Sequence, residues 1–339
     1  MKPAVLITGA NGFLGSYLCR EFLAHGYEVH GLCRANSDRA NLAGIELRVH
    51  EADLRDPDGV RAALAAFSAS VDVPWVVHNA ATISYRAADA QLQEDVNHQG
   101  TRHVLEASRA ANVQRFLHVS SVVAVGVARK GETLDEDSPW NAEDLGIDYV
   151  RTKRRAEEAA LAEAEALDVR VVNPGAIFGP VASSSNSLRF LQQLALGKIG
   201  LVTPPGGMSV VGVDDCATGV RLALESGRTG RRYVLAESYL SSLQLFGLAK
   251  RLLRGDDVRP PLGAVPRWLW PALTPLARCL EWRNPNTLLS RQTVFMLGQT
   301  FRFQGTRART ELQWTPRPFE DVLRDAIEVL RANGSLPSR

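Results

Sequence analysis

Through its first half the chain alternates short β-branched runs with longer stretches of helical periodicity. The strand-like runs are residues 5–7, 28–33, 47–50, 75–78, 116–119 and 169–172. Helices are expected at residues 12–24 and, after the capping sequence Asp56-Pro57, up to about Phe67. Regular alternation of this kind predicts an α/β fold, a Rossmann-type doubly wound parallel sheet.

The second half of the chain is less regular, because Pro180 and the run Pro204-Pro205-Gly206-Gly207 interrupt it. Residues 210–213 and 233–235 are again strand-like and flank a helical stretch at 215–225, so we expect the chain to return to the first sheet at about 208–236. Residues 1–180 are therefore expected to form one domain. Residues 181–207 and 237–339, which include an amphipathic helix at 319–332, are expected to form a smaller, interleaved C-terminal lobe.

Composition excludes several classes of protein. The 339 residues carry 39 Lys and Arg against 37 Asp and Glu without a long block of one sign, so no nucleic-acid partner is expected. The four cysteines form no CxxC pair, which gives neither zinc-ligand spacing nor a disulfide framework. The N-terminus lacks the pattern of a signal peptide, and two prolines and an arginine interrupt the apolar stretch 268–280. A cytoplasmic protein with no membrane partner is expected.

A glycine-rich octet lies where the first strand turns into the first helix. Glycines at such a turn let backbone N–H groups approach a pyrophosphate, and the helix N-terminus adds a partial positive charge. The turn therefore predicts a dinucleotide site, which makes residues 1–180 the dinucleotide-binding domain and the C-terminal lobe the substrate-binding part. The expected cofactor-binding residues of this turn are Gly9, Asn11, Gly12, Phe13, Leu14 and Gly15.

The end of the second strand bears on the choice of cofactor. An NAD enzyme usually has Asp or Glu there for the ribose 2′-hydroxyl, whereas a 2′-phosphate requires a nearby cation instead. Cys33 occupies this position, and Arg34 and Arg39 follow. NADP(H) is favoured and NAD(H) is the alternative, since both arginines could also be solvated loop charges.

The octet has the spacing GxxGxxG with Thr8 ahead of it, and it resembles the extended short-chain dehydrogenase/reductase superfamily. The resemblance runs from Met1 to about Asn333. It implies that Asp53 and Leu54 contact the adenine, that Asn97 belongs to the family's NxxGT helix, and that the segment from Pro174 to Pro180 begins at the nicotinamide. Asn173 precedes that segment, where the family often has Arg. Further cofactor contacts implied by the resemblance are Asn79, Ala80, Ala81 and Ile177.

Tyr149 and Lys153 lie four residues apart in a strongly helical run, so both project from one face of a helix. This spacing also occurs by chance on solvated helices, but here it lies between the fifth and sixth strands, like the YxxxK motif of the superfamily. The resemblance implies that Tyr149 protonates or deprotonates the substrate oxygen, that Lys153 stabilises the phenolate and binds the nicotinamide ribose, and that Ser121 steadies the substrate oxygen. The resemblance favours Ser121 over Ser120, because Ser121 lies five residues before Gly126, the position that the family's catalytic Ser or Thr takes in similar SSxxxxG segments. Ser120 is expected to cap the strand end.

The sequence is most similar to the dihydroflavonol-reductase-like and hydroxysteroid-dehydrogenase-like branch of the superfamily, which implies reduction of a ketone or aldehyde or oxidation of an alcohol. Sugar dehydration is disfavoured, because no carboxylic acid follows Ser121. An NAD-dependent nucleoside-diphosphate-sugar epimerase uses the same Ser-Tyr-Lys set and remains the alternative. A dinucleotide-sensing protein without turnover is a third hypothesis, although such proteins commonly lack the tyrosine or the lysine.

Other residues have simpler interpretations. The histidines share no metal-ligand spacing, so no metal is expected. Asn97 could polarise a water behind Lys153 or merely join helix to strand. The late tryptophans Trp268, Trp270 and Trp282 could line an apolar substrate pocket, although a place in the core of the lobe is the more common role. A small carbonyl or alcohol, uncharged or partly apolar, is the expected substrate. A homodimer is expected because related enzymes pair through the helices around the tyrosine.

Overall fold

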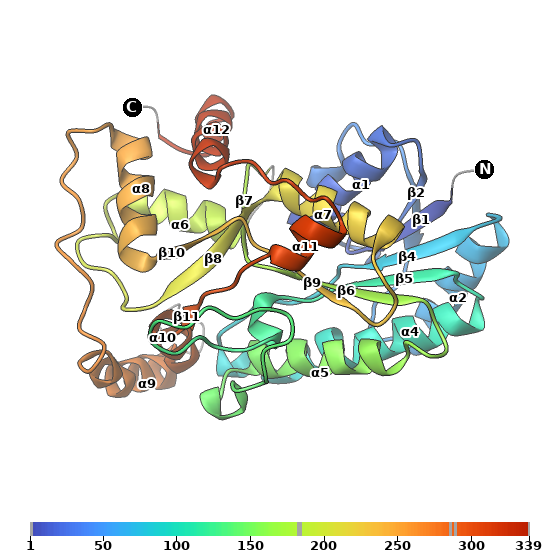
Figure 1. Cartoon of the computed structure of the whole chain (residues 1–339), viewed down its shortest axis with the longest axis horizontal. Helices are drawn as coiled ribbons and strands as arrows, with labels where there is room; N and C mark the ends of the chain where they lie inside the picture. The colour runs from blue at the N-terminus through green and yellow to red at the C-terminus, as the bar shows by residue number, and fades with distance from the viewer. Residues whose placement is uncertain (1–2, 182–184, 285–286, 288–289, 338–339) are drawn as a thin grey trace.

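The main sheet has seven parallel strands in the order β3-β2-β1-β4-β5-β6-β9 (Figure 1). The computed structural model describes residues 3–181, 185–284, 287 and 290–337. The order runs outward from β1 in both directions, which is the doubly wound arrangement predicted from the sequence. The strands are β1 (Ala4–Thr8), β2 (Glu28–Cys33), β3 (Arg48–Glu51), β4 (Pro74–His78), β5 (Arg115–Val119), β6 (Val169–Pro174) and β9 (Arg232–Leu235).

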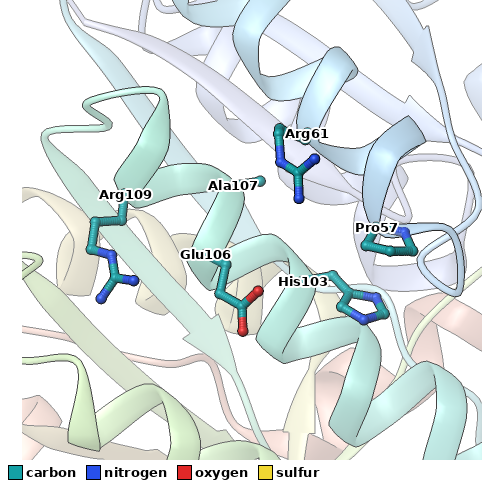
Figure 2. A pocket seen from close by; sticks show the side chains of 6 residues that line it. All are labelled: Pro57, Arg61, His103, Glu106, Ala107 and Arg109. Carbon is teal, nitrogen blue, oxygen red and sulfur yellow. The ribbon is translucent and has the colours of Figure 1, made fainter.

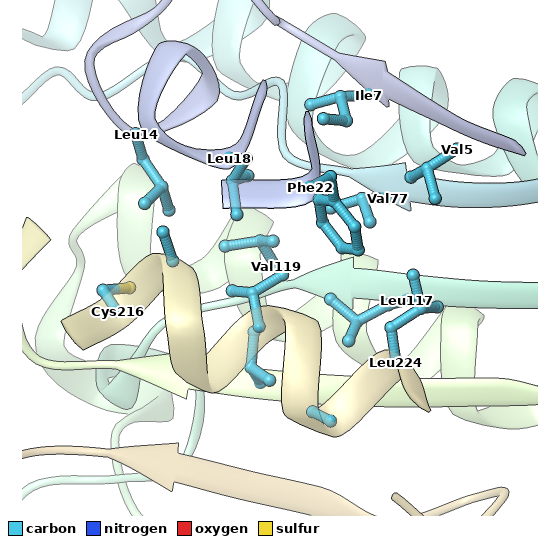
Figure 3. Close-up of a cluster of buried hydrophobic side chains, with 14 of the residues drawn as sticks. Val5, Ile7, Leu14, Leu18, Phe22, Val77, Leu117, Val119, Cys216 and Leu224 are labelled. Carbon is cyan, nitrogen blue, oxygen red and sulfur yellow. The ribbon is translucent and has the colours of Figure 1, made fainter. Parts of the chain in front are cut away.

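Helices cover both faces of this sheet. One face packs against α1 (Phe13–Ala24) and α7 (Val213–Ser226), and the other against α2 (Pro57–Ala69), α4 (Gly100–Ala110) and α5 (Asp148–Ala162). Figure 3 shows the first of these layers, where Leu18 and Phe22 of α1 lie with Val77 of β4 and Leu117 of β5. The predicted start of α2 is confirmed, because the Asp56 side chain accepts a hydrogen bond from the Asp58 N–H.

The return to the sheet was only partly predicted. Strand β9 joins the main sheet beside β6, as expected. Residues 210–213 do not: β8 (Gly207–Gly212) lies at the centre of a second sheet, where β7 (Ala176–Phe178) and β11 (Thr300–Phe301) pair with it parallel and β10 (Ser238–Ser241) antiparallel. Val213 is the first residue of α7. An apolar run predicts a strand but not its partner, which long-range pairing decides.

The C-terminal lobe is built on this second sheet. Its core joins α6 (Asn186–Ala195), α8 (Ser242–Arg254) and α12 (Phe319–Ala332) to β7 and β8. The remaining helices are α9 (Thr274–Arg283), α10 (Arg291–Gly298) and α11 (Thr306–Glu311). Residues 182–184 of the predicted lobe lie outside the described residues. Trp268 and Trp282 are on the surface, 78% and 86% exposed, so they are not in the core of the lobe.

Candidate active site

The turn from β1 into α1 is built around close backbone approach. A methyl group on Gly15 would lie 2.1 Å from the Gly9 carbonyl oxygen, and one on Gly9, whose φ is +65°, would lie 2.9 Å from the Ala80 Cα. Gly12 is the N-cap of α1 and supplies no capping side chain, and no acidic residue lies in the first turn. The first N–H groups of the helix are therefore available to an anion, which fits a pyrophosphate.

The ends of β1 and β4 are joined beside this turn. The Thr8 hydroxyl accepts hydrogen bonds from the backbone N–H groups of Asn79 and Ala80, both at 3.1 Å, and contacts His78 Nδ1 at 2.8 Å. The Asn79 amide reaches the Gly9 carbonyl at 3.4 Å. Thr8 thus has a structural role here, and it brings the predicted residues Asn79 and Ala80 next to the glycine turn.

The end of β2 was expected to have two available cations, Arg34 and Arg39, and no carboxylate, but the structure differs. Arg39 is engaged by Glu51, with Nη2 and Oε1 2.5 Å apart. Glu51 is the residue of β3 that pairs with Cys33, so a carboxylate lies beside the end of β2 although the last residue of that strand is not acidic. Arg34 is exposed and makes no ion pair within the described residues. Of the two predicted arginines, the structure leaves Arg34 available.

Two residues expected at the adenine have partners within the chain. The Asp53 carboxylate accepts hydrogen bonds from Arg55, 3.0 Å from Nε and 2.7 Å from Nη2, and these lower its pKa. Leu54 is buried against Gly100, where an added methyl group would lie 2.9 Å from the Leu54 Cβ. Gly100 therefore lets α4 approach the loop that holds Leu54.

Asn97 lies in a π-helical turn, Glu94–Gln99, ahead of α4. Its side-chain oxygen accepts from the Thr82 N–H at 2.7 Å, and its amide donates to the Thr82 carbonyl at 2.9 Å and to the Thr152 hydroxyl at 3.2 Å. Asn97 therefore joins the loop after β4 to α5, next to Lys153. Of the two interpretations open from the sequence, these contacts fit the joining role. Short π-helical segments often mark functional sites.

The structure brings Ser121 and Tyr149 together. Ser121 follows β5, and Tyr149 lies in the first turn of α5, where its side chain is buried. Burial raises the pKa of the Tyr149 phenol to about 12, and a hydrogen bond with the Ser121 side chain partly opposes this rise. Ser120 does not cap the strand end as expected: its hydroxyl is buried without a partner in the described part of the chain, and Ser121 accepts the Val123 N–H.

Lys153 lies one turn after Tyr149 and is also buried. Its Nζ donates a 2.8 Å hydrogen bond to the Val119 carbonyl at the end of β5. Burial lowers the pKa of Lys153 to about 8, and the Glu157 carboxylate opposes that fall. The ammonium is therefore held at the same strand end as Ser121, and its residue lies one turn along α5 from Tyr149.

Glu157 and Asn173 form a buried network under these groups that the sequence analysis did not include. The Asn173 amide nitrogen is 2.5 Å from a Glu157 carboxylate oxygen and 3.0 Å from the Ser121 carbonyl. Arg232 reaches the other Glu157 oxygen at 3.2 Å. The i, i+4 spacing of Lys153 and Glu157 was a signal in the sequence, whereas the positions of Asn173 and Arg232 depend on the pairing of β6 with β9.

Tyr85 and two histidines complete the surroundings of the candidate site. The Tyr85 ring meets the Tyr149 ring edge-on, with 6.0 Å between centroids. His78 and His118 stack at 5.4 Å in the sheet, and burial lowers the pKa of each, that of His78 to about 3. Both are neutral at physiological pH. No group of His, Cys, Asp and Glu in the described ranges is arranged to hold a metal ion.

The predicted nicotinamide segment begins at the end of β6. Pro174 is the last residue of β6, and Ile177 lies in β7 opposite Val211. A methyl group on Gly175 would lie 2.5 Å from the Ser209 carbonyl oxygen, so this glycine lets the segment cross close to β8. Ala81, by contrast, is exposed in the loop after β4.

A separate surface pocket lies between α2 and α4 (Figure 2). Pro57, Arg61, His103, Glu106 and Arg109 line it, and its walls are mostly charged. None of Ser121, Tyr149 and Lys153 belongs to it. In the described residues, no helix has the length and apolar character needed to cross a membrane.

The glycine turn and the strand order define a Rossmann-type α/β scaffold of the kind that binds a dinucleotide, with Ser121 after β5 and with Tyr149 and Lys153 on α5. Residues 5–236 match the model of the NAD dependent epimerase/dehydratase family. The chain belongs to this family, the extended short-chain dehydrogenases/reductases.

Individual relatives span nearly the whole chain. Sterol demethylase protein B of Methylococcus capsulatus is 32% identical over 98% of this chain and 99% of its own. A Synechocystis sp. protein that bears the name dihydroflavonol 4-reductase is 28% identical over 98% and 96% of the two chains. The solved structure of PA4631, a nucleoside-diphosphate-sugar epimerase from Pseudomonas aeruginosa, is 25% identical, covers 99% of this chain and all of its own, and superposes with a TM-score of 0.78.

Proposed function

We propose that this protein is an NADP(H)-dependent oxidoreductase that reduces a ketone or aldehyde, or oxidises the matching alcohol, at a site formed by Ser121, Tyr149 and Lys153. The observation that carries the proposal is that a buried phenol, hydrogen-bonded to Ser121, lies one helical turn from a buried ammonium. A phenol alone is a poor proton donor or acceptor near neutral pH, so a cation at this distance is what gives it a catalytic use.

In this proposal Tyr149 gives its proton to the substrate oxygen during reduction, and Ser121 donates a hydrogen bond to the same oxygen. Lys153 would supply a positive charge that favours the phenolate when Tyr149 gives up its proton. The nicotinamide, when bound, supplies or accepts the hydride. Gly9, Gly12 and Gly15 would hold its pyrophosphate, with Pro174 and Ile177 at the nicotinamide end and Asp53, Leu54, Ala80 and Ala81 towards the adenosine.

The preference for NADP(H) rests on Arg34. Cys33 leaves the end of β2 without a carboxylate of its own, and Arg34 is a cation without an ion pair in the described residues. Arg39 supports NADP(H) less than Arg34 does, because Arg39 already pairs with Glu51. Glu51 could instead accept the 2′-hydroxyl of NAD(H). NAD(H) is therefore the alternative cofactor.

The substrate is proposed to be an uncharged or partly apolar carbonyl compound. The names of the Methylococcus and Synechocystis relatives refer to a sterol, which is largely apolar, and to a dihydroflavonol, which is uncharged and partly apolar, and both relatives span nearly the whole chain. We also propose a cytoplasmic homodimer that pairs through helices that include α5, and light scattering of the purified protein tests the dimer.

A nucleoside-diphosphate-sugar epimerase is the second candidate, because PA4631 shares the fold over its whole length. The two functions differ in how they use the cofactor. An epimerase retains NAD through both half-reactions, whereas a reductase exchanges NADPH. Absorbance and fluorescence of the purified protein, followed by NADPH oxidation with aldehydes, cyclic ketones, and flavonoid-like and steroid-like compounds, decide between them. Turnover with one of these carbonyls supports the proposal, and tightly retained NAD without such turnover would overturn it.

A further inference from the structure

The exposed large apolar side chains are concentrated at one end of the molecule. Of the 13 that the described residues expose, nine come from two segments, 196–202 and 262–282. We call the exposed side chains of these two segments the apolar end. In Figure 1 the connection from α8 to α9 runs along the edge of the molecule opposite β2 and α2. Scattered apolar residues are normal on a surface, but a contiguous group marks an interaction site.

Backbone hydrogen bonds hold the two segments side by side. The Leu262 N–H donates to the Leu201 carbonyl at 2.8 Å, and the Val265 N–H donates to the Thr203 carbonyl at 2.9 Å. Leu201 and Leu262, which are 70% and 79% exposed, are therefore neighbours, although 60 residues separate them in the sequence. The two segments of the apolar end therefore meet at Leu201 and Leu262.

Helix α9, which follows the second segment's loop along the chain, is also largely exposed. Of its ten residues only Ala277 is buried, while Leu276 and Trp282 are exposed. Trp268 lies just before the helix and is exposed as well. An amphipathic tryptophan side chain is well suited to the boundary between lipid and water.

The charge around the apolar end indicates its partner. From Arg251 at the end of α8 to Arg291 the chain has seven arginines and three acidic residues, a surplus of four positive charges, whereas the whole chain has a surplus of two. Arg278 and Arg283 are exposed and make no ion pair within the described ranges. A second copy docked on the same face would bring two sets of arginines together, which is unfavourable. An anionic lipid surface complements both the apolar and the basic residues.

We propose that the apolar end docks this protein onto the surface of an anionic lipid bilayer, without spanning it. Tryptophan and leucine side chains enter the boundary between headgroups and acyl chains, and Arg278 and Arg283 pair with anionic headgroups. This docking goes beyond the proposed reaction and does not depend on it, and it replaces the sequence-based expectation that the protein has no membrane partner.

The docking surface is connected to the catalytic tyrosine. Trp282 and Glu281 line a surface pocket together with Ala87 and Ala88. Tyr85 lies two residues before Ala87 in the same loop. The Tyr85 ring contacts Tyr149, and the Tyr85 carbonyl accepts a hydrogen bond from Ser290. Docking therefore places the lipid surface next to the loop that contacts Tyr149.

Vesicle flotation of the full chain tests the proposal without any turnover. Phosphatidylcholine vesicles with about one third phosphatidylserine should bind the wild-type protein, and raising the salt concentration should weaken binding. The double variant Trp268→Ser, Trp282→Ser should lower the partition coefficient about tenfold or more. The double variant Arg278→Ser, Arg283→Ser should lower it about tenfold and reduce its salt dependence. Val329→Ser, at an exposed apolar position on α12, is the matched control and should bind like the wild type.

Three results would overturn the proposal: no binding to the anionic vesicles, equal binding to pure phosphatidylcholine, or equal binding by the wild type and the tryptophan variant. Light scattering provides the competing outcome. If the wild type is a dimer, the tryptophan variant is a monomer and neither binds vesicles, the apolar end is an interface between two copies. Because both tryptophans are exposed, the variants should keep the thermal unfolding temperature of the wild type.

Discussion

The Asn173 side-chain amide lies 2.5 Å from the Glu157 carboxylate and also donates to the Ser121 carbonyl. One amide thus links the strand that ends at Pro174, the helix that carries Tyr149 and Lys153, and the loop that carries Ser121. Glu157 is completely buried, and its charge is balanced by Arg232 on β9 and opposes the burial-induced fall in the pKa of Lys153. We therefore regard Glu157 as a positioning residue for the proposed catalytic lysine.

Glu157→Gln should shift the pH dependence of turnover. Burial lowers the pKa of Lys153 to about 8 and Glu157 raises it, so removing the carboxylate should lower that pKa further. The ammonium would then be lost at a lower pH, and the alkaline limb of the kcat profile should move to lower pH. The measurement is a pH–rate profile with NADPH and a carbonyl substrate.

Glu158→Gln is the matched control, because Glu158 is half exposed and pairs only with Arg154 at 2.7 Å within the described part of the chain. Its profile should coincide with that of the wild type. An alkaline limb that stays in place in Glu157→Gln would show that the carboxylate does not act on Lys153. The glutamine can still accept from Asn173 but leaves Arg232 without its anion, so a loss of stability of about 1–3 kcal/mol is also expected.

Arg34→Ala should weaken the binding of NADPH selectively. A guanidinium that pairs with a 2′-phosphate contributes a charge-assisted contact of about 1.5–3 kcal/mol, so the KM for NADPH should rise about tenfold or more while that for NADH changes little. Arg39→Ala should have a smaller effect, because Glu51 already engages Arg39. Equal changes with both cofactors in Arg34→Ala would contradict the assignment of NADP(H).

Gly15→Ala should damage the cofactor turn. The added methyl group would lie 2.1 Å from the Gly9 carbonyl oxygen, so the turn must shift and both NADPH and NADH should bind more weakly. Overpacking of this kind costs about 1–3 kcal/mol of stability. Gly247→Ala on α8 is the control: its methyl group meets no described atom within 4 Å, and the helix should gain about 0.5–1 kcal/mol. Cofactor titration and thermal unfolding measure both effects. Unchanged affinity in Gly15→Ala would argue against a pyrophosphate at this turn.

Local sequence patterns were sufficient to predict the strands of the main sheet and the order of the helices between them. Asp56 and Pro57 begin α2 as their residue types require, and β1 to β6 lie within one or two residues of the expected runs. Hydrophobic periodicity and helix capping depend only on residues that are close in the sequence, which is why both can be recognised in a single sequence. The placement of β8 in a second sheet was missed, since the same strand pattern is compatible with either sheet.

The site shows the same division between local and long-range information. The positions of Tyr149 and Lys153 on one helix face follow from their spacing, whereas the contact of Ser121 with Tyr149 depends on how β5 and α5 pack. Arg39 and Asp53 were expected to be available to the cofactor, but Glu51 and Arg55 engage them. Glu51 reaches the end of β2 through the β2–β3 register, which a search for an acidic residue within β2 could not find.

The most direct test of the account is the turnover of Tyr149→Phe beside that of Tyr85→Phe, a partly buried tyrosine whose ring contacts the first. The proposal predicts that Tyr149→Phe loses about a hundredfold or more in kcat, the usual contribution of a general acid, while NADPH binds with unchanged affinity. Tyr85→Phe should keep most of the wild-type rate. If Tyr149→Phe reduced its carbonyl substrate at the wild-type rate, Tyr149 would not be the proton donor and the proposed mechanism would be wrong.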